Sequence, residues 1–429
     1  MGFGLAATAA LFMVFRTGAS AWGRARIGDY LDTSEVDWES ERARIRERSR
    51  PAGDGAARAD CAASYATLPR IPAGDDLDEL ARAANAGPGA PLSPAVVAAV
   101  ERYRPEIDAL REAARCSRYE LTDGSAWVDY GDVHPVWRAG FLVEAEGHTL
   151  AARGDAPGAL DRYLTLAKVG EDMSAGSSFA GIVGGRAASR AYLGVAALVA
   201  SAPRLPAAEL AALDQTLAER GRHLPLLSDV LRKERLGLRK AAISLRDQGA
   251  LPGRPPPVEQ PTDLRALTLV FSTEAVFGRA LPLLDARLRA AEQVALDAQR
   301  DPSQVLRFPE VASDSLATEA SALDIVQHPD NYQHVAGLDC ALRAAHLLAR
   351  TAVKAERAYM DGRYPEALPD LAQDPCGTGP LEYRRSPDGD GYTLSSVGAN
   401  GKADGPRIAG SRGGDSDDIV VARRGANVL

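Results

Sequence analysis

Motifs of several well-known kinds of site are missing from this sequence. It has four cysteines and six histidines in 429 residues, and no two of them have the CxxC or CxH spacing of a zinc site. It also has no HExxH pair, no Gly-Lys-Ser/Thr of a phosphate-binding loop and no Gly-x-Ser-x-Gly elbow of a serine hydrolase. We therefore expect none of these three chemistries.

Clusters of positive charge are missing too. The formal net charge is −8 and the pI is near 5.5, with no Lys/Arg block and no basic patch interleaved with aromatic residues. Proteins that bind nucleic acid present such basic patches to the phosphates, so we exclude nucleic acid as a partner. The apolar share of 45% and the charged share of 25% are ordinary for a globular protein. The length allows two or three domains.

The N-terminus is apolar, but a long apolar run is missing. No charged residue precedes Arg16, and the run is shorter than the roughly 20 residues of a membrane-spanning helix. One interpretation is a signal peptide cleaved near Ala19-Ser20-Ala21. Another is a membrane anchor that either extends through Trp22, with Arg16 reaching toward the headgroups, or is shortened by a start codon assigned too late. A third is an ordinary buried helix. We favour export or anchoring.

The four cysteines suggest disulfides. An even number of cysteines in an exported protein is typical of disulfide pairs. Local pairing would join Cys61 to Cys116 and Cys340 to Cys376. Three connectivities are open, and the sequence does not choose among them. The alternative is four free, buried thiols.

The middle of the chain has the periodicity of helices. Ser93 and Pro94 predict an N-cap followed by the first helical residue. We expect a short charged surface helix near residues 35–48 and no strand before residue 380. The other predicted helices cover residues 93–103, 135–153, 155–170, 184–202, 206–220, 224–248, 262–300, 315–325 and 339–359, with a Pro-rich connector at 251–261.

Two of these helices have a tetratricopeptide-like pattern. Gly147, Ala159 and Tyr163 have the spacing of that repeat's small, small and aromatic packing residues, and Gly154-Asp155 supplies the turn. No second copy follows at a period of about 34 residues, and a solenoid needs about three repeats. We therefore expect a helical hairpin with small-residue packing.

The pattern changes to strands near the C-terminus. Residues 381–385 and 392–397 are rich in β-formers, and Asp388-Gly389 between them is typical of a tight β-turn. Residues 419–422 predict a third strand. The fold class is therefore mainly α: a helical body and a long helix that leads into a small antiparallel β-module.

Several short motifs lie in this region. Gly-Arg-Tyr-Pro-Glu-Ala-Leu begins at residue 362, Asp-Pro-Cys-Gly at 374, Pro-Leu-Glu-Tyr at 380 and Gly-Tyr-Thr-Leu-Ser-Ser-Val-Gly at 391. Together they resemble the C-terminal module of type II secretion pseudopilins, above all the major pseudopilin, over about the last seventh of the chain. The resemblance implies a calcium-binding loop after the Tyr-x-Leu-x-Ser-x-Gly strand. The candidate calcium ligands are Asn400, Asp404, Asp415, Asp417 and Asp418.

The chain differs from that family at two places. Arg407 and Arg412 lie inside the acidic loop, where cations disfavour a metal site. Residues 1–15 contain no glutamate, which the prepilin cleavage motif requires. We therefore expect a helical envelope protein that shares the terminal module and is not itself a pseudopilin subunit. The alternative for the acidic loop is a solvated turn.

Other chemically capable residues have plainer interpretations. His328, His334 and His346 are expected to be surface or capping histidines, and the glycines between residues 176 and 185 to serve close helix packing or a loop. Glu144 and Glu146 are expected to be ordinary helix or loop acids. Glu310 and Asp314 have the same interpretation.

These observations predict four segments. Residues 1–22 form a membrane anchor or signal, 23–90 a polar linker or stalk, 91–336 a helical body, and 337–429 the long helix with the β-module. The leading hypothesis is a non-enzymatic scaffold or protein-interaction module of the cell envelope. We expect it to be anchored in the inner membrane with its bulk in the periplasm, or secreted to the periplasm, and to bind secretion-system components. The alternatives are an envelope enzyme with a pocket in the helical body and a calcium-stabilised structural domain.

Overall fold

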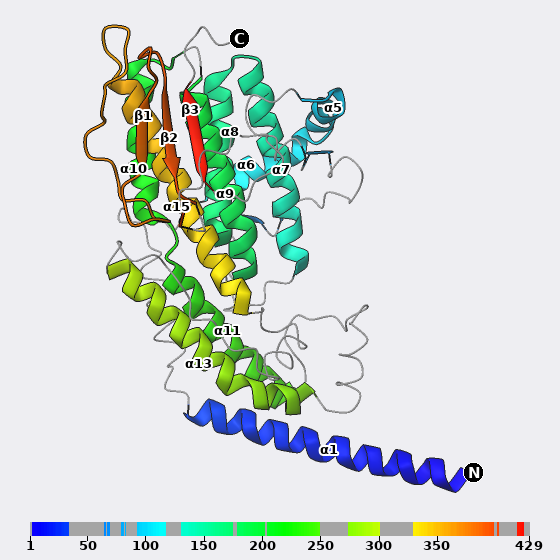
Figure 1. Cartoon of the computed structure of the whole chain (residues 1–429). Coiled ribbons are helices and arrows are strands. Elements are labelled where there is room, and N and C mark those ends of the chain that lie inside the picture. The colour runs from blue at the N-terminus through cyan, green and yellow to red at the C-terminus, as the bar shows by residue number, and fades with distance from the viewer. Residues whose placement is uncertain are drawn as a thin grey trace, which may run out of the picture.

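Ten helices and one three-stranded sheet make up the described part of the chain (Figure 1), so the expected mainly α class is confirmed. A computed structural model describes residues 2–33, 64–65, 67–68, 79–80, 82, 92–116, 130–174, 178–201, 204–248, 273–300, 329–398, 401–402 and 418–423. The helices are α1 (Gly2–Thr33), α5 (Pro94–Arg102), α6 (Arg104–Ala113), α7 (Tyr130–Ala152), α8 (Ala156–Ser174), α9 (Ser178–Val199), α10 (Ala207–His223), α11 (Leu227–Gln248), α13 (Thr273–Arg300) and α15 (Pro329–Arg357). The predicted helices at 35–48 and 315–325 lie outside the described residues.

Local sequence signals set the ends of several helices. The Ser93 side chain accepts a hydrogen bond from the Val96 amide at 3.2 Å, which confirms the predicted N-cap of α5. Between α7 and α8, Gly154 has a φ of +79°, a conformation that glycine adopts without strain. Asp155 then caps α8, because its side chain accepts a hydrogen bond from the Gly158 amide at 3.0 Å.

The larger of two hydrophobic cores lies among helices α5 to α10, helix α15 and the sheet. Helix α8 packs against α7 and α9, α9 packs against α15, and α15 packs against α10. The fully buried side chains of Tyr163, Leu166 and Tyr192 lie in this core. The β-sheet covers α15 and the side of α9 (Figure 1).

Helices α8 and α9 approach unusually closely because glycines meet at their crossing. A Cβ atom on Gly184 would lie 2.4 Å from the backbone oxygen of Gly170, and one on Gly170 would lie 2.6 Å from that of Gly184. Such distances leave no room for a side chain. The expectation that glycines between residues 176 and 185 serve close helix packing is confirmed for Gly184.

The C-terminal sheet has the predicted strands. They are β1 (Glu382–Arg385), β2 (Tyr392–Ser396) and β3 (Ile419–Arg423), antiparallel in the order β1-β2-β3. At the β1–β2 turn Gly389 has a φ of +79°, and its amide donates to the Ser386 oxygen at 2.9 Å. Alternation along β2 and β3 places Tyr392, Leu394 and Val421 in the larger core.

A second, smaller core holds α1 against α11 and α13. It contains Ile27, Tyr30 and Leu31 of α1 together with leucines of the other two helices. Helix α1 is continuous to Thr33 and so passes through the segment boundary expected at residue 22. Helix α15 contributes Val335 and Ala336 to this core and residues from Leu342 onward to the larger one, so it joins the two.

None of the described helices is both long and apolar enough to cross a membrane.

The glycine crossing gives a direct test with a matched control. Gly184→Ala should lower the free energy of unfolding by about 1–3 kcal/mol, because its methyl group would overlap the α8 backbone. At the neighbouring Gly185 the nearest atom to an added Cβ is 3.7 Å away. Gly185→Ala should therefore stabilise the protein slightly, by about 0.5–1 kcal/mol from helix propensity. Denaturant unfolding of both variants checks this, and equal effects of the two substitutions would contradict the packing described.

Candidate functional site

The predicted calcium loop lies largely outside the described residues. Of its five candidate ligands only Asp418 is described, and it is half-buried just before β3. Asn400, Asp404, Asp415 and Asp417 are outside. Among the described residues no group of three or more His, Cys, Asp or Glu side chains could hold a metal ion.

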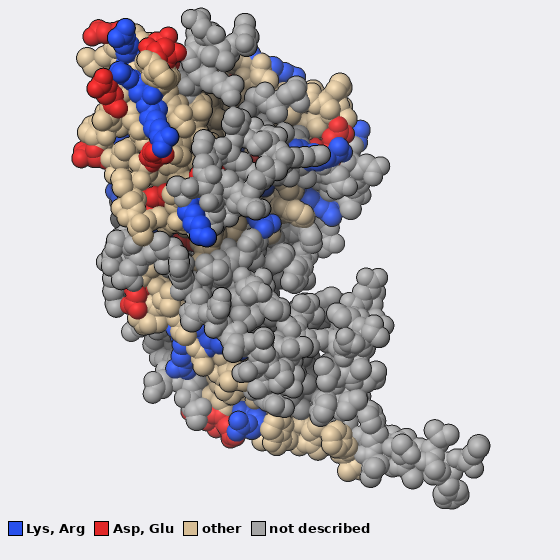
Figure 2. Space-filling model, viewed as in Figure 1, with Lys and Arg blue, Asp and Glu red and all other residues tan. Residues whose placement is uncertain are grey.

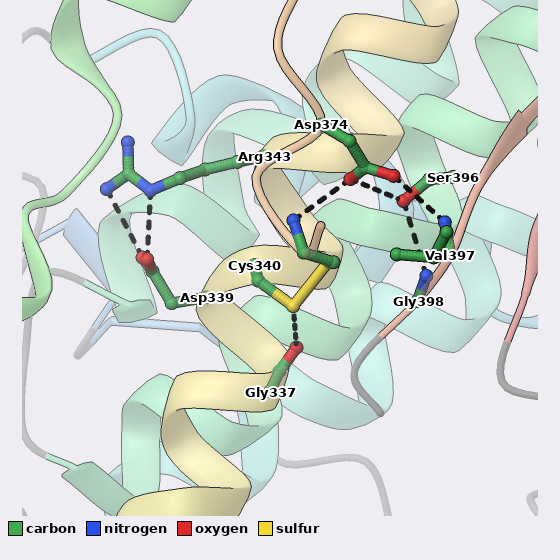
Figure 3. Close-up of a disulfide and its surroundings, with 9 residues drawn as sticks. Gly337, Asp339, Cys340, Arg343, Asp374, Ser396, Val397 and Gly398 are labelled. Carbon is green, nitrogen blue, oxygen red and sulfur yellow. Dashed lines mark hydrogen bonds and ion pairs between the residues drawn. A yellow bond between two sulfur atoms is a disulfide. The ribbon is translucent and has the colours of Figure 1, made fainter. Parts of the chain in front are cut away.

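A disulfide joins Cys340 of α15 to Cys376 of the segment before β1 (Figure 3). Cys116 is also disulfide-bonded, whereas its predicted partner Cys61 lies outside the described residues. No described cysteine is free. The disulfide fixes the start of the β-module to the middle of the long helix.

Asp374 ties the same segment to the end of β2. Its carboxylate accepts hydrogen bonds from the amides of Cys376 and Val397, both at 2.9 Å, and from the Ser396 hydroxyl at 2.8 Å (Figure 3). The side chain is 2% exposed. Three donors compensate the loss of water around a buried carboxylate. The Asp-Pro-Cys-Gly motif therefore joins this segment to the end of β2 through the Asp374 carboxylate and to α15 through the disulfide of Cys376.

Other buried carboxylates lie between helices, and each has a donor on the protein. Glu144 and Glu146 of α7 are both 2% exposed, which their interpretation as ordinary acids missed. The pairs are Glu144 with Arg190, Glu146 with Arg104 and Arg162, Glu171 with Tyr192 and Arg220, Asp172 with Tyr65 and Lys168, Asp285 with Arg235 and Arg289, Glu292 with Arg232 and Arg235, and Glu356 with Tyr364 and Arg204.

Glu144 and Arg190 link α7 to α9. The Arg190 Nε lies 3.1 and 3.0 Å from the two carboxylate oxygens of Glu144, and the guanidinium lies 5.2 Å above the Phe141 ring. Burial raises the pKa of Glu144 to about 7, although the Arg190 charge acts in the opposite direction. This carboxyl group therefore titrates near neutral pH.

Glu146 links three elements. It accepts a hydrogen bond from Arg104 of α6 at 2.9 Å, and its second oxygen accepts from Arg162 of α8. Only 3% of the Glu146 side chain is exposed, against 11% for Arg162. A buried ion pair of this kind fixes the relative position of its helices, because breaking it leaves a charge without compensation.

The last turn of α8 carries two adjacent buried acids. Glu171 accepts hydrogen bonds from Tyr192 of α9 and from Arg220 of α10, the latter at 3.3 Å. Asp172 accepts one from Tyr65 at 2.7 Å and also pairs with Lys168. Burial raises the pKa of both acids, and the nearby cations oppose the shift.

His346 is buried, so the expectation of a surface or capping role is wrong for this histidine. It is 3% exposed, and its Nε2 lies 2.7 Å from the Leu217 carbonyl, to which it can donate. Burial lowers its pKa, so the neutral form is favoured. His328 and the side chain of His334 lie outside the described residues. Periodicity places His346 on α15, but does not show which face packs against α10.

Tyr163 lies where the tetratricopeptide-like pattern predicts a packed aromatic residue. It is fully buried, and added Cβ atoms on Gly147 or Gly194 would lie 2.9 or 2.8 Å from its ring. Its hydroxyl lies 2.7 Å from the Nδ1 of His148. The ring therefore fills the space that two glycines leave between α7, α8 and α9.

The arrangement favours a structural use of these charges. The carboxylates between helices are held by donors from neighbouring elements, which positions the helices and satisfies the buried groups. Comparison of the chain with protein-family models, with curated proteins and with solved structures gives no match.

The Glu144 carboxyl group predicts a specific pH dependence. Its pKa is about 7 in the folded state and 4.5 without burial. The folded state therefore holds this proton more tightly than the unfolded chain. The contribution of Glu144 to the free energy of unfolding should fall as the pH rises from about 4.5 to about 7, by on the order of 3 kcal/mol.

Glu144→Gln should remove this dependence. The unfolding free energy of the variant minus that of the wild type should rise between pH 4.5 and 7 and then level off. Glu112→Gln is the control, because the Glu112 side chain is 70% exposed and its difference from the wild type should stay small and constant. Denaturant titrations at a series of pH values measure both, and a difference that falls over this window would contradict the assignment.

Proposed function

We propose that this chain is a non-enzymatic protein of the cell envelope that scaffolds other proteins. The observation that carries the location is the state of the cysteines: every described cysteine is disulfide-bonded. Disulfides persist in oxidising compartments such as the periplasm and are rare in the cytosol. This supports a periplasmic bulk, whether secreted or held at the inner membrane.

The scaffold role is supported by how the body is held together. Ion pairs fix α7, α8, α9 and α10 to one another, and α15 belongs to both cores. A body with fixed helices can present surface residues in constant positions to partners. Figure 2 shows Lys/Arg and Asp/Glu interspersed over the β-module on the face in view, so partner recognition there does not depend on a patch of one charge.

A link with type II secretion machinery is the narrower form of the proposal. Its support is the resemblance of residues 362–421 to the terminal module of pseudopilins, in a segment that follows the long helix α15 and contains the antiparallel sheet. Fold analogy does not transfer function, so partner identification decides this point.

Thiol trapping tests the location. In cells that express the full chain, acid quenching stops thiol–disulfide exchange, and a maleimide-polyethylene glycol reagent is then added after denaturation to label every free thiol. We expect no added mass without reductant and four additions after reduction, because all four cysteines pair in an oxidising compartment. The Cys340→Ser/Cys376→Ser variant is the matched control and should give two additions after reduction. Four additions without reductant would place the chain in a reducing compartment and overturn the proposed location.

Site-specific photocrosslinking tests the scaffold role. A photoreactive amino acid replaces Met360, which is 71% exposed, or Leu283, which is 43% exposed, in the full chain in cells. Exposed apolar side chains are enriched where proteins bind one another, so we expect at least one position to give a discrete protein adduct. Arg115, with a side chain 72% exposed, is the charged control position. No protein adduct at either apolar position would count against a scaffold.

A further inference from the structure

Helix α1 changes character along its length. From Gly23 onward it is amphipathic: Ile27, Tyr30 and Leu31 are buried against α11 and α13, while Arg26 and Asp29 are exposed. The sequence from Gly2 to Phe15 has no charged residue. A helix with one apolar face packs on a body, whereas a helix that is apolar on all sides is typical of a buried or lipid-embedded segment.

Three large apolar side chains in the N-terminal part of α1 are largely exposed. Val14 is 71% exposed, Phe15 53% and Trp22 49%. Phe15 and Trp22 are seven residues apart, which places them on one side of the helix. In Figure 1 the N-terminal half of α1 extends beyond the other described helices. Figure 2 shows Lys/Arg and Asp/Glu side chains of α1 near its packed end and side chains of other kinds further toward the N-terminus.

We propose that the N-terminal half of α1 inserts into a lipid bilayer, with Trp22, Arg24 and Arg26 at the boundary with water. The inference deepens the proposed envelope location by naming a lipid surface as the partner of this helix. Insertion here means burial of an apolar helix in lipid, without a crossing of the bilayer. Tryptophan favours the membrane interface, because its ring is apolar and its N–H group is polar. Arginine near a helix end keeps its head group in water while its stem lies along apolar surface.

Lipid fits this segment better than a protein helix. A partner helix covers one face of α1 and leaves the remaining apolar circumference in water, whereas lipid surrounds the whole helix. The polarity also changes along the helix: Gly2–Phe15 carries no charge, Arg16 is the first charged residue, and Arg24, Arg26 and Asp29 follow Trp22. A water–lipid interface requires such a change from apolar to charged residues, and the long stem of an arginine such as Arg16 can extend to the headgroups.

The packed half of α1 then sets the position of the body at the membrane. A Cβ atom on Gly278 of α13 would lie 2.6 Å from the Gly23 backbone oxygen, so the two helices cross in close contact directly after Trp22. Ile27 is fully buried one turn further on. Because α1 is packed against α11 and α13 directly after Trp22, the lobe of α11 and α13 would lie next to the lipid headgroups.

Vesicle flotation of the purified full chain tests the insertion. Vesicles of phosphatidylcholine alone and with added phosphatidylglycerol are the two probes. We expect the wild type to float with both and more strongly with the anionic vesicles, because Arg24 and Arg26 lie at the boundary. Phe15→Glu/Trp22→Glu should lower the bound fraction at least tenfold, since charge is expelled from lipid. Met360→Glu is the matched control: Met360 is 71% exposed between α15 and β1, outside the lobe of α11 and α13, and binding should not change.

Tryptophan quenching gives a readout that does not depend on the folding of the glutamate variant. Trp22 is kept, and Trp38, Trp127 and Trp137 are changed to phenylalanine. Phosphatidylcholine brominated near the headgroup should quench the Trp22 emission more than lipid brominated near the chain end. Equal or absent quenching would overturn the interface position.

Two other outcomes would overturn the proposal. One is no flotation of the wild type with either vesicle. The other is a dimer without lipid, measured by light scattering, that the Phe15→Glu/Trp22→Glu variant abolishes, because a second copy would then cover α1. Vesicle binding is measured on purified protein, so its result for lipid insertion does not depend on the result of thiol trapping in cells, which tests the envelope location. Vesicle binding together with four free thiols would keep the lipid contact and reject the envelope location.

Discussion

Burial of carboxylates between helices is the constraint on which the rest of the body depends. A charge removed from water is costly unless a donor or an opposite charge replaces the lost hydration. In the described part of the chain this requirement fixes which helices are neighbours: Glu144 needs Arg190, and Glu146 needs Arg104 and Arg162. Each pair is satisfied only when its helices are in register. The close approach of α8 and α9 at Gly170 and Gly184 lies next to Glu171 of α8, which accepts a hydrogen bond from Tyr192 of α9. The same side chains in a solvated cleft would suit catalysis; between packed helices they favour positioning.

Helix α15 connects this body to the smaller core. The joint, the stretch of α15 between Ala336 and Leu342, is linked to other segments by a disulfide and by the hydrogen bonds of the neighbouring Arg343. Residues up to Ala336 belong to the smaller core and residues from Leu342 to the larger one, so Cys340 lies between the two. The disulfide to Cys376 fixes the β-module at this point. Arg343, one turn after Asp339, donates hydrogen bonds to that carboxylate (Figure 3). It also donates to the Pro225 carbonyl just before α11. The joint therefore ties the module, the long helix and the start of α11 together, as a scaffold that presents fixed surfaces requires.

Local chemistry predicted much of the fold, whereas tertiary pairing was not predictable. The Ser93 cap, the Gly154 and Gly389 turns and the β1–β2 hairpin follow from interactions between residues close in sequence. Glu144 and Arg190 are 46 residues apart, so periodicity places each on a helix without showing that they meet. His346 was misread for the same reason: its partner is a carbonyl 129 residues away. The continuation of α1 to Thr33 was missed because the charges after Arg24 resemble a linker, whereas its buried face is fixed by contact with α13.

A double-mutant cycle on Glu146 and Arg162 tests the structural role of the buried charges most directly. The free energies of unfolding of Glu146→Gln, Arg162→Gln and the double variant are compared with that of the wild type. If the pair holds α7 to α8, each single substitution destabilises the protein and the coupling energy is about 1–3 kcal/mol. A coupling near zero, with Glu146→Gln more stable than the wild type, would contradict this account. It would mark Glu146 as a residue kept for chemistry at the expense of stability.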